Sequence, residues 1–312
     1  MVSGSLEIKV IGDLSAGSQI DQDWSDLVKG NAASGFMQSR QWASFKAQQG
    51  ISSLHLGIFE AKNLVAGSLF YFMDAGGGSA FWVAPEGPVL PWHDDELALR
   101  CLTMLIDYCE KISQEKRAFI GLRIEPRLPL PVPDMLLEFG RSPMDLIPSE
   151  TVYLSLSDPL DRIMARMKPK GRYNTRLSQR KMVSVRQGSA GEIIDIFYPL
   201  LSEAGRRDNF AVEPLSFFVE LASTLMPTGM LTLLLAELEG KPVGGLLMIA
   251  YGKMATYLYG GISNTNRDAM IGYALQWEAI KLAKEAGCTH YDMYGFDRFL
   301  QSAQSLRTLF PL

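Results

Sequence analysis

The sequence of 312 residues is poor in the side chains from which disulfide frameworks and metal centres are built. It has three cysteines and three histidines, namely Cys101, Cys109, Cys288, His55, His93 and His290. An odd, scattered set of cysteines argues against a disulfide framework and favours a reducing compartment, where buried cysteines act as small hydrophobic side chains. The histidines lack the spacing of metal ligands. We therefore expect no metal site.

The sequence also lacks the long apolar segments that export or membrane insertion requires. Its N-terminus has no basic stretch followed by an apolar run, so we expect no signal peptide. The longest apolar runs, such as residues 231–236 and 244–251, are too short to cross a bilayer. The net charge of -4 means that any site for phosphate or nucleic acid must come from a local cluster of basic residues. We expect a cytoplasmic protein without a transmembrane segment.

Several sequence motifs of catalysis and nucleotide binding are missing as well. The chain has no nucleophile elbow, no catalytic-triad spacing, no Walker loop and no Rossmann fingerprint. In acetyltransferases, a glycine-containing loop at a helix N-terminus holds the pyrophosphate of coenzyme A. The segment 266–274 occupies that place here, but Met270 stands where the first glycine should be. This departure disfavours coenzyme A, and we expect no cofactor.

The order of predicted elements repeats, which indicates an internal duplication. Each half reads as three strands joined by tight turns, a helix and a fourth strand. The first set lies at 54–60, 65–73, 79–83, 95–113 and 119–124, and the second at 230–237, 242–251, 254–261, 269–286 and 289–294. Tight turns make neighbours antiparallel, and the strand after the helix should return beside the third. We predict an α+β fold: two acetyltransferase-like (GNAT) domains, residues 1–150 and 151–312, with mainly antiparallel mixed sheets flanked by helices.

A strongly basic window is the sharpest local feature. Residues 163–191 contain eight basic and no acidic side chains: Arg166, Lys168, Lys170, Arg172, Arg176, Arg180, Lys181 and Arg186. Pro169 predicts the start of a helix, on which Arg172, Arg176 and Arg180 form one ridge. Like charges at this spacing repel, and a bound polyanion would offset the repulsion. We therefore expect a phosphate contact at the residues Lys170, Arg172, Arg176 and Arg180, the alternative being a merely soluble basic helix.

Two further segments could bind a substrate. Arg207 lies near the end of a predicted helix, where a cation would equally well favour the helix dipole. Tyr257 and Tyr259 alternate along a predicted strand and should face the same side of the sheet. Gly260 and Gly261 follow them and would let a ligand approach the backbone. The alternative for this strand is ordinary core packing.

Several segments, taken together and in order, resemble the Fem family of peptidoglycan bridge aminoacyltransferases (FemA, FemB and FemX). The matching pieces are Gln38-Ser39…Trp42…Lys46, Pro85…Gly87-Pro88, Glu125-Pro126, Arg172-Tyr173-Asn174…Arg176, Arg206-Arg207-Asp208…Phe210, Tyr257…Tyr259-Gly260-Gly261, and the run from Gln276 through Asp292 to Gly295. Their order along most of the chain carries the resemblance.

The resemblance implies a reaction in which the amine of a peptidoglycan stem peptide attacks the ester carbonyl of an aminoacyl-tRNA. The acceptor would be UDP-MurNAc-pentapeptide or a lipid-linked precursor, with a peripheral contact to the inner face of the membrane. Positioning and stabilisation of the tetrahedral oxyanion would supply the catalysis. The implied substrate-binding residues are Lys46, Trp42, Arg207 and Gly260, and the basic helix would contact the tRNA. The implied catalytic residues are Tyr257, Tyr259 and Asp292.

The chain departs from the family pattern at three points. Glu86 replaces the arginine of the usual Pro-Arg-Gly-Pro turn, and Pro91 stands where an acidic residue is usual. No insertion corresponds to the long helical arm, so the chain resembles the compact members. After Phe299 a Phe-Lys…Phe-Gly-Gly motif is missing, and Arg298 or Arg307 would have to replace its lysine. We therefore expect a truncated or frame-shifted C-terminus, with activity that is reduced or lost. The alternatives are an N-acyltransferase of the GNAT fold that uses coenzyme A or another thioester, and a degenerate paralogue that only binds precursor or tRNA.

Overall fold

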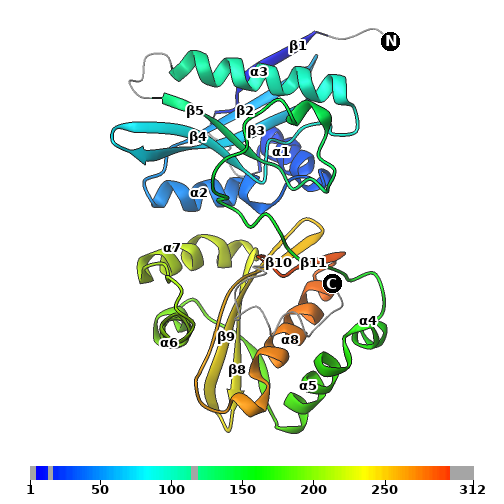
Figure 1. Ribbon diagram of the computed structural model, residues 1–312, viewed down its shortest axis with the longest axis vertical. Helices are drawn as coiled ribbons and strands as arrows, with labels where there is room; N and C mark the ends of the chain where they lie inside the picture. Colours follow the sequence, from blue (N-terminus) through cyan, green and yellow to red (C-terminus); the bar gives the residue numbers. More distant parts are fainter. Residues whose placement is uncertain (1–4, 13–16, 114–118, 296–312) are drawn as a thin grey trace. The chain divides into compact units, whose positions relative to one another are not determined.

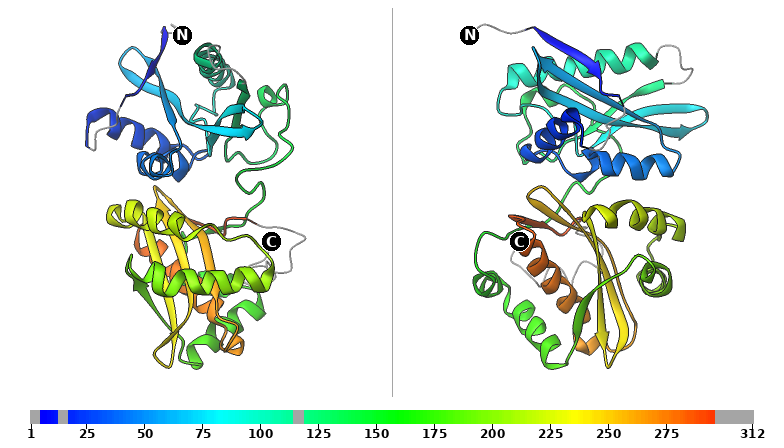
Figure 2. Two further views of the ribbon diagram at one scale, coloured as in Figure 1. Left: turned by 90° about the vertical axis from the view of Figure 1, so that its left-hand side faces the viewer. Right: turned by 180° about the vertical axis from the view of Figure 1, so that it is seen from behind.

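The computed structural model describes residues 5–12, 17–113 and 119–295 (Figure 1). The chain divides into two compact units between Ile147 and Pro148, close to the division at 150 that the repeated element order suggests. Each unit has one mixed sheet covered by helices on both faces (Figure 2). The C-terminal departure after Phe299 lies outside the described residues.

The first unit is a five-stranded sheet in the order β1-β2-β3-β4-β5. Its elements are β1 (Leu6–Val10), α1 (Gln19–Gly30), η1 (Phe36–Gln38), α2 (Arg40–Gln48), β2 (Ser53–Glu60), β3 (Asn63–Gly76), β4 (Ser79–Pro85), α3 (Asp95–Ser113), β5 (Phe119–Glu125) and η2 (Asp134–Leu136). Neighbouring strands are antiparallel except β4 and β5. Ser39 caps α2 by accepting a hydrogen bond from the backbone N–H of Trp42 (3.1 Å).

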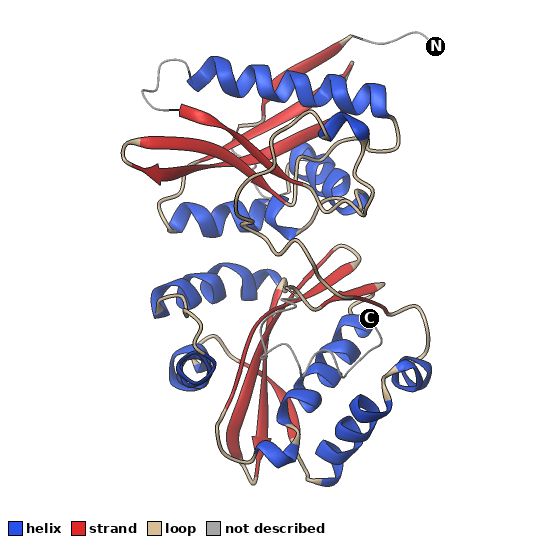
Figure 3. Cartoon of the chain, viewed as in Figure 1, coloured by secondary structure: helices blue, strands red, loops and turns tan. Residues whose placement is uncertain are grey.

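The helices of the first unit cover opposite faces of its sheet (Figure 3). α3 packs on one face through an apolar cluster that includes Phe70 and Leu105. α1 and α2 cover the other face, where Trp24, Phe36 and Phe45 are almost fully buried. Alternation along β3 explains this division, because Phe70 points to α3 whereas its neighbours point to α1 and α2.

The second unit is a six-stranded sheet in the order β6-β11-β10-β9-β8-β7. Its elements are β6 (Tyr153–Ser155), α4 (Leu160–Arg166), α5 (Pro169–Arg180), β7 (Ser184–Gly188), η3 (Ile193–Phe197), α6 (Tyr198–Asp208), α7 (Leu215–Leu225), η4 (Met226–Thr228), β8 (Leu231–Leu238), β9 (Lys241–Tyr251), β10 (Met254–Ile262), η5 (Arg267–Ala269), α8 (Ile271–Glu285) and β11 (His290–Asp292). Only β10 and β11 are parallel among the strands that the structure describes here. α4, α5 and α8 cover one face, and α6 and α7 the other (Figure 1).

The predicted fold class is confirmed. In each unit the strand after the long helix returns parallel to the third strand, β5 beside β4 and β11 beside β10. Within the described part of the second unit the longest helix is α8, with 15 residues, so no long helical arm lies there. Among the described helices, none is long and apolar enough to cross a membrane. The three cysteines are buried free thiols, as expected of small hydrophobic side chains.

Candidate functional site

The candidate site lies in the second unit, where two parallel strands separate. The pairing of β10 with β11 ends at Thr256 opposite Asp292. β10 continues to Ile262 beside β9, whereas the backbone N–H of Met293 donates to the carbonyl of Val152, next to β6. Within the described residues, the second half of β10 therefore has a strand on one side only.

The first unit is closed at the corresponding place. β4 and β5 stay paired up to Pro85 opposite Glu125, the last residue of each strand. Continuous pairing uses the backbone groups within the sheet, whereas strands that separate leave N–H and C=O groups for another partner. Of the two duplicated sheets, only the second separates its parallel strands in the part of the chain that the structure describes.

A β-bulge marks the start of the open stretch of β10. Tyr257 pairs with Met248 and Tyr259 with Leu247, which makes Leu258 the extra residue. A bulge leaves the extra residue out of the ladder and is common beside active sites, where it redirects side chains. The bulge follows Thr256 directly, so the irregular backbone and the separation of the strands coincide.

The bulge shows that the expected orientation of Tyr257 and Tyr259 is wrong. Regular alternation would place both on one side, but the inserted residue shifts the register by one. Tyr257 packs against the core beneath α8. The ring of Tyr259 lies on the opposite face, 5.0 Å from that of Phe218 and 6.0 Å from that of Phe217, both on α7. The two hydroxyl groups therefore serve different faces of the sheet.

The two glycines after the bulge make room for parts of the protein itself. A Cβ atom on Gly260 would lie 2.5 Å from the hydroxyl oxygen of Tyr257. A Cβ atom on Gly261 would lie 2.6 Å from Cα of Leu201, in α6. Gly261 thus allows α6 to pack directly on β10, and Gly260 allows the Tyr257 ring to lie against the open stretch of the strand.

The tyrosine hydroxyls in β10 are held in their neutral form. Burial raises the pKa of Tyr257 to about 12. Burial and the nearby Glu213 carboxylate raise the pKa of Tyr259 to about 12. Neutral hydroxyl groups can donate hydrogen bonds but do not act as general bases near neutral pH. Chemistry at this strand would therefore use them as donors.

Asp292 stands at the end of β11, where it leaves β10. Its carboxylate accepts hydrogen bonds from the Thr151 hydroxyl (2.5 Å) and from the backbone N–H of Tyr294 (2.8 Å), and its side chain is buried. The adjacent Tyr291 donates its hydroxyl proton to the side-chain carbonyl of Gln276 (2.8 Å). Asp292 thus fixes the turn by which the chain departs from β10.

Arg207 is tied to the loop at the end of β10. Its guanidinium forms two bonds with Asp208 (2.7 and 3.0 Å) and donates to the Ile262 carbonyl and the Asn264 side chain, both at 2.9 Å. The Asp208 carboxylate raises the pKa of Arg207. Four of its five N–H groups thus have partners within the described residues. The arginine links α6 to β10, and one donor remains for a ligand.

Lys46 and Trp42 lie together on α2 of the first unit. The Lys46 ammonium lies 5.4 Å from the Trp42 ring centroid and 5.1 Å from that of Phe45, and it donates to the Gln49 side chain (3.0 Å). The indole N–H of Trp42 is buried and has no hydrogen-bond partner in the described structure. A buried donor beside a lysine is a suitable contact for an anionic or carbonyl oxygen.

Buried hydrogen bonds of two polar side chains hold the segment before α2 to the sheet of the first unit. The partners of these side chains could not be assigned from the sequence. The Gln38 side chain is bonded to the backbone of Leu69 (2.8 and 3.1 Å) and of Pro85 (2.8 Å). The Glu86 carboxylate accepts from the backbone N–H of Met37 (2.8 Å) and from the guanidinium of Arg127 (2.9 Å). The glutamate that replaces the family arginine is thus paired with an arginine 41 residues later. In the sequence, the unusual charge of Glu86 within the turn motif was the one indication of this pair.

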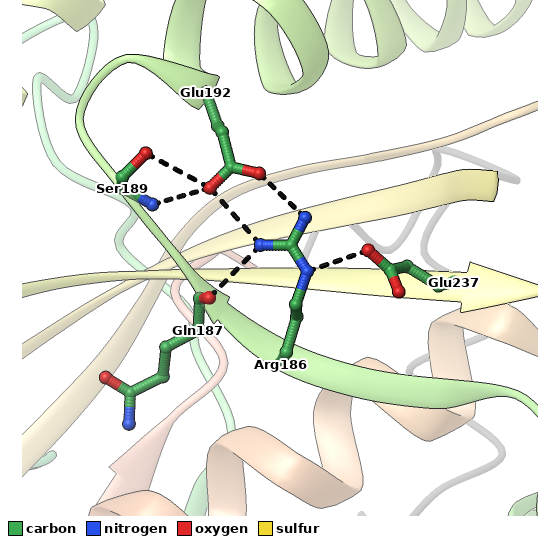
Figure 4. Close-up of polar contacts among 5 residues, drawn as sticks. All are labelled: Arg186, Gln187, Ser189, Glu192 and Glu237. Carbon is green, nitrogen blue, oxygen red and sulfur yellow. Dashed lines mark hydrogen bonds and ion pairs between the residues drawn. The ribbon is translucent and has the colours of Figure 1, made fainter. Parts of the chain in front are cut away.

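Much of the basic window is neutralised by acids from other segments. Arg166 pairs with Asp158 (3.0 Å) and Lys181 with Asp268 (2.9 Å). Arg186 pairs with Glu192 and Glu237, both at 2.7 Å (Figure 4). The hydrogen bond from Arg186 is the main reason why the pKa of Glu192 is lowered to about 2. These three cations connect elements of the fold.

The expected ridge on α5 also loses one of its members. The Arg172 guanidinium donates to the carbonyls of Ala165 (2.9 Å) and Met167 (3.1 Å), at the end of α4. Free carbonyls at a helix C-terminus attract such donors, so this arginine caps α4. Pro169 does begin α5, as predicted. Lys170, Arg176 and Arg180 remain exposed on the helix.

The loop before α8 differs from a pyrophosphate cradle. Met270 adopts the left-handed conformation (φ 57°), which glycine would favour, and its side chain packs against the core of the second unit. The described residues contain no group of three or more His, Cys, Asp or Glu side chains arranged to hold a metal ion.

Two family models match the chain, one in each unit. The FemAB family matches residues 21–133 and the acetyltransferase (GNAT) domain matches residues 169–299. A lipid II:glycine glycyltransferase of Staphylococcus epidermidis is 21% identical to this chain, covering 89% of it and 83% of the relative. A protein of the same name from Staphylococcus saprophyticus is 22% identical, with the same coverage.

Solved structures show the same fold. A crystal structure of FemX superimposes with a TM-score of 0.81 at 18% identity, covering 93% of this chain and 92% of that one. A tandem GNAT protein from the clavulanic acid biosynthesis pathway superimposes with a TM-score of 0.54 at 13% identity, covering 98% and 96%. The FemAB family model, the relatives that match most of the chain and the ordered motifs agree in their similarity to the Fem family.

Proposed function

We propose that the protein is an aminoacyltransferase that moves an amino acid from aminoacyl-tRNA to the stem-peptide amine of a peptidoglycan precursor. The observation that carries this proposal is the open stretch of β10 beyond Thr256, with its bulge at Leu258. It supplies backbone groups for an acyl carbonyl. Relatives along most of the chain are named for glycyl transfer to lipid II, which supports the acceptor class.

In the proposed reaction the donor ester carbonyl lies beside the bulge. The acceptor amine attacks the carbonyl carbon, and the tetrahedral intermediate carries its negative charge on the former carbonyl oxygen. Donors that are already in place stabilise such an oxyanion, and we assign this role to a backbone N–H of the bulge and to the Tyr257 hydroxyl. The intermediate collapses to an amide when the ribose oxygen leaves and takes up the proton that the amine gives away.

The acceptor would be held by its diphosphate. We assign this contact to Lys46, whose ammonium lies close to the Trp42 ring. Trp42 would contribute its indole N–H, which has no hydrogen-bond partner among the described residues. Asp292 would act as a positioning residue that keeps β11 apart from the open stretch of β10.

A transfer assay tests the proposal. The protein is incubated with a pool of aminoacyl-tRNAs and UDP-linked muramyl pentapeptide or lipid II, and mass spectrometry detects an added residue. We expect a mass gain, with Tyr257→Phe lowering kcat by about 100-fold because one oxyanion donor is lost. Tyr259→Phe is the matched control, since its ring is enclosed by Phe217 and Phe218, and its kcat should stay within about twofold.

The outcomes separate the proposal from its rivals. If the protein transfers an acyl group from a coenzyme A thioester and none from aminoacyl-tRNA, the donor is the thioester, even though Met270 replaces the first glycine of the coenzyme A loop. Binding of the precursor without any product would indicate a degenerate paralogue. If kcat falls equally in Tyr257→Phe and Tyr259→Phe, the Tyr257 hydroxyl does not have the role that we assign to it.

A further inference from the structure

One face of α5 carries three cations and an aromatic ring that the fold itself does not use. Lys170, Tyr173, Arg176 and Arg180 fall within about a third of the circumference of the helix. All four are exposed, and Tyr173 keeps 56% of its surface accessible. The opposite face is buried against α8 through the small and polar residues Gly171, Asn174, Thr175 and Ser178. We call the exposed side the α5 face.

Within the described residues, no acidic side chain offsets the positive charge of the α5 face, whereas acids do offset that of the neighbouring cations. Arg166, Lys181 and Arg186 form ion pairs with acids from other segments. Within the described residues, Lys170, Arg176 and Arg180 have no acidic partner. A cluster of three cations in a chain with a net charge of -4 is a local attraction for a polyanion.

The exposed tyrosine narrows the choice of polyanion. Arg180 lies over the Tyr173 ring, 5.5 Å from its centroid, so the ring is held on the surface between cations. Aromatic rings alternating with basic side chains are typical of surfaces that bind single-stranded nucleic acid, where the ring stacks on an unpaired base and the cations contact phosphates. A double helix, whose bases are already stacked on one another, would gain less from a flat ring in this position.

The α5 face also leads toward the candidate site. Lys170 and Arg180 are about 15 Å apart along the helix axis, at 1.5 Å per residue. Directly after Arg180, the Lys181 ammonium contacts Asp268 (2.9 Å) in η5, within the segment that joins β10 to α8. The end of the α5 face thus lies next to the segment that leaves the open stretch of β10.

We propose that the α5 face binds the RNA strand of the donor, with Tyr173 stacked on an unpaired base and Arg176 and Arg180 on the adjoining phosphates. The proposal rests on the proposed function for the identity of the RNA. Arg172, which the sequence pattern placed in the same ridge, is excluded because it caps α4. The partner is a strand near the 3′ end of the RNA, because the transferred ester is carried there.

Binding of uncharged RNA tests the α5 face without any need for catalysis. The probe is a fluorescent RNA hairpin with a four-nucleotide single-stranded 3′ end, measured by anisotropy at several salt concentrations with the full-length protein. Arg176→Ala/Arg180→Ala should weaken binding at least about tenfold and lower the salt slope by about 1.5, because two phosphate contacts are lost. The control Lys62→Ala/Lys111→Ala removes two exposed cations from the first unit and should leave the affinity within about twofold.

The ring is tested by a second pair of variants. Tyr173→Ala should weaken binding of the tailed hairpin about five- to tenfold but leave a blunt hairpin unaffected, whereas Tyr173→Phe should bind like the wild type, because stacking needs the ring alone. Circular dichroism at the assay temperature checks that each variant is folded.

Every outcome bears on the proposal. Equal affinity of the α5 double variant and its control would overturn it. If Arg176→Ala/Arg180→Ala binds phosphatidylglycerol vesicles less well than the wild type but binds RNA equally well, the partner of the α5 face is a lipid surface and the proposal is overturned. If the wild-type protein transfers an amino acid while the α5 variants bind RNA normally, the proposed function stands, but the α5 face is not its RNA-binding surface. If the α5 variants lose RNA binding but the wild-type protein transfers no amino acid, the α5 face binds RNA and the proposed function is wrong.

Discussion

His55 is a titratable residue that the fold keeps away from water. Its side chain lies in β2 and contacts the Trp24 ring edge to face, with centroids 4.1 Å apart. Its Nε2 atom is buried and has no hydrogen-bond partner in the described structure. Burial lowers the pKa of His55 from 6.5 to about 3. The folded protein therefore excludes a proton that the unfolded chain takes up below pH 6.5.

This difference makes His55 a source of acid sensitivity. Stability is complete above pH 6.5 and falls by about 1.4 kcal/mol per pH unit as the pH decreases toward 3, which is roughly 2 kcal/mol at pH 5. His55→Phe keeps the aromatic contact with Trp24 and removes the titration. We expect urea unfolding at pH 7.5 and pH 5 to show a drop in free energy of unfolding that is about 2 kcal/mol smaller in the variant.

The exposed His93 provides the control for this measurement. His93→Phe removes a histidine from the loop before α3 and should keep the full drop between the two pH values. If His55→Phe loses as much stability on acidification as the wild type, burial of His55 is not the source of the sensitivity.

Charged residues show why a local pattern does not reveal which charges are free. Residues 163–191 contain no acid, and the sequence alone therefore suggests eight available cations. The partner of Arg186 at Glu237 lies 51 residues away, and that of Lys181 at Asp268 lies 87 residues away. Such pairs depend on strand order and helix packing, which the local sequence does not specify. Exposed pairs of this kind stabilise the fold by about 1 kcal/mol or less.

At the scale of elements, Gly261 controls how closely α6 can approach β10. A Cβ atom there would lie 2.6 to 2.7 Å from backbone atoms of Leu200 and Leu201, which cannot move as a flexible side-chain end could. Gly261→Ala should destabilise the protein by about 1–3 kcal/mol, the usual cost of overpacking. At Gly272, near the start of α8, a Cβ atom would meet nothing within 4 Å, so Gly272→Ala should stabilise by about 0.5–1 kcal/mol.

Thermal unfolding of both alanine variants compares these two effects. A decrease of the melting temperature for Gly261→Ala, together with an increase for Gly272→Ala, agrees with close packing of α6 on β10. A stable Gly261→Ala protein would mean that α6 can shift away from the strand.

The sequence was sufficient for elements whose causes are local. Ser39 and Pro169 mark helix starts through capping and a fixed φ, and tight turns make neighbouring strands antiparallel. The bulge at Leu258 was beyond reach, because it depends on the register between β9 and β10 and not on a local residue preference. For this reason the orientation of Tyr257 relative to Tyr259, and with it part of the candidate site, was predicted incorrectly.

At the scale of the whole molecule, each unit has an apolar core of its own. One core packs β2 to β5 against α3, and the other packs β8 to β11 against α8. The tryptophans are distributed unevenly, since Trp24, Trp42, Trp82 and Trp92 belong to the first unit and Trp277 to the second. Tryptophan fluorescence therefore reports mainly on the first unit, whereas far-ultraviolet circular dichroism reports on both.

The buried pair of Glu86 and Arg127 can be used to destabilise the first unit alone. Their side chains are 1% and 8% exposed. Glu86→Gln removes the carboxylate that Arg127 contacts at 2.9 Å, and loss of one partner of a buried pair costs about 3–5 kcal/mol. If the two units unfold separately, the fluorescence midpoint in urea falls while circular dichroism becomes biphasic. Glu192→Gln, which breaks an exposed pair of the second unit, should shift stability by about 1 kcal/mol or less. Coincident transitions in Glu86→Gln would instead mean that the two cores unfold as one cooperative body.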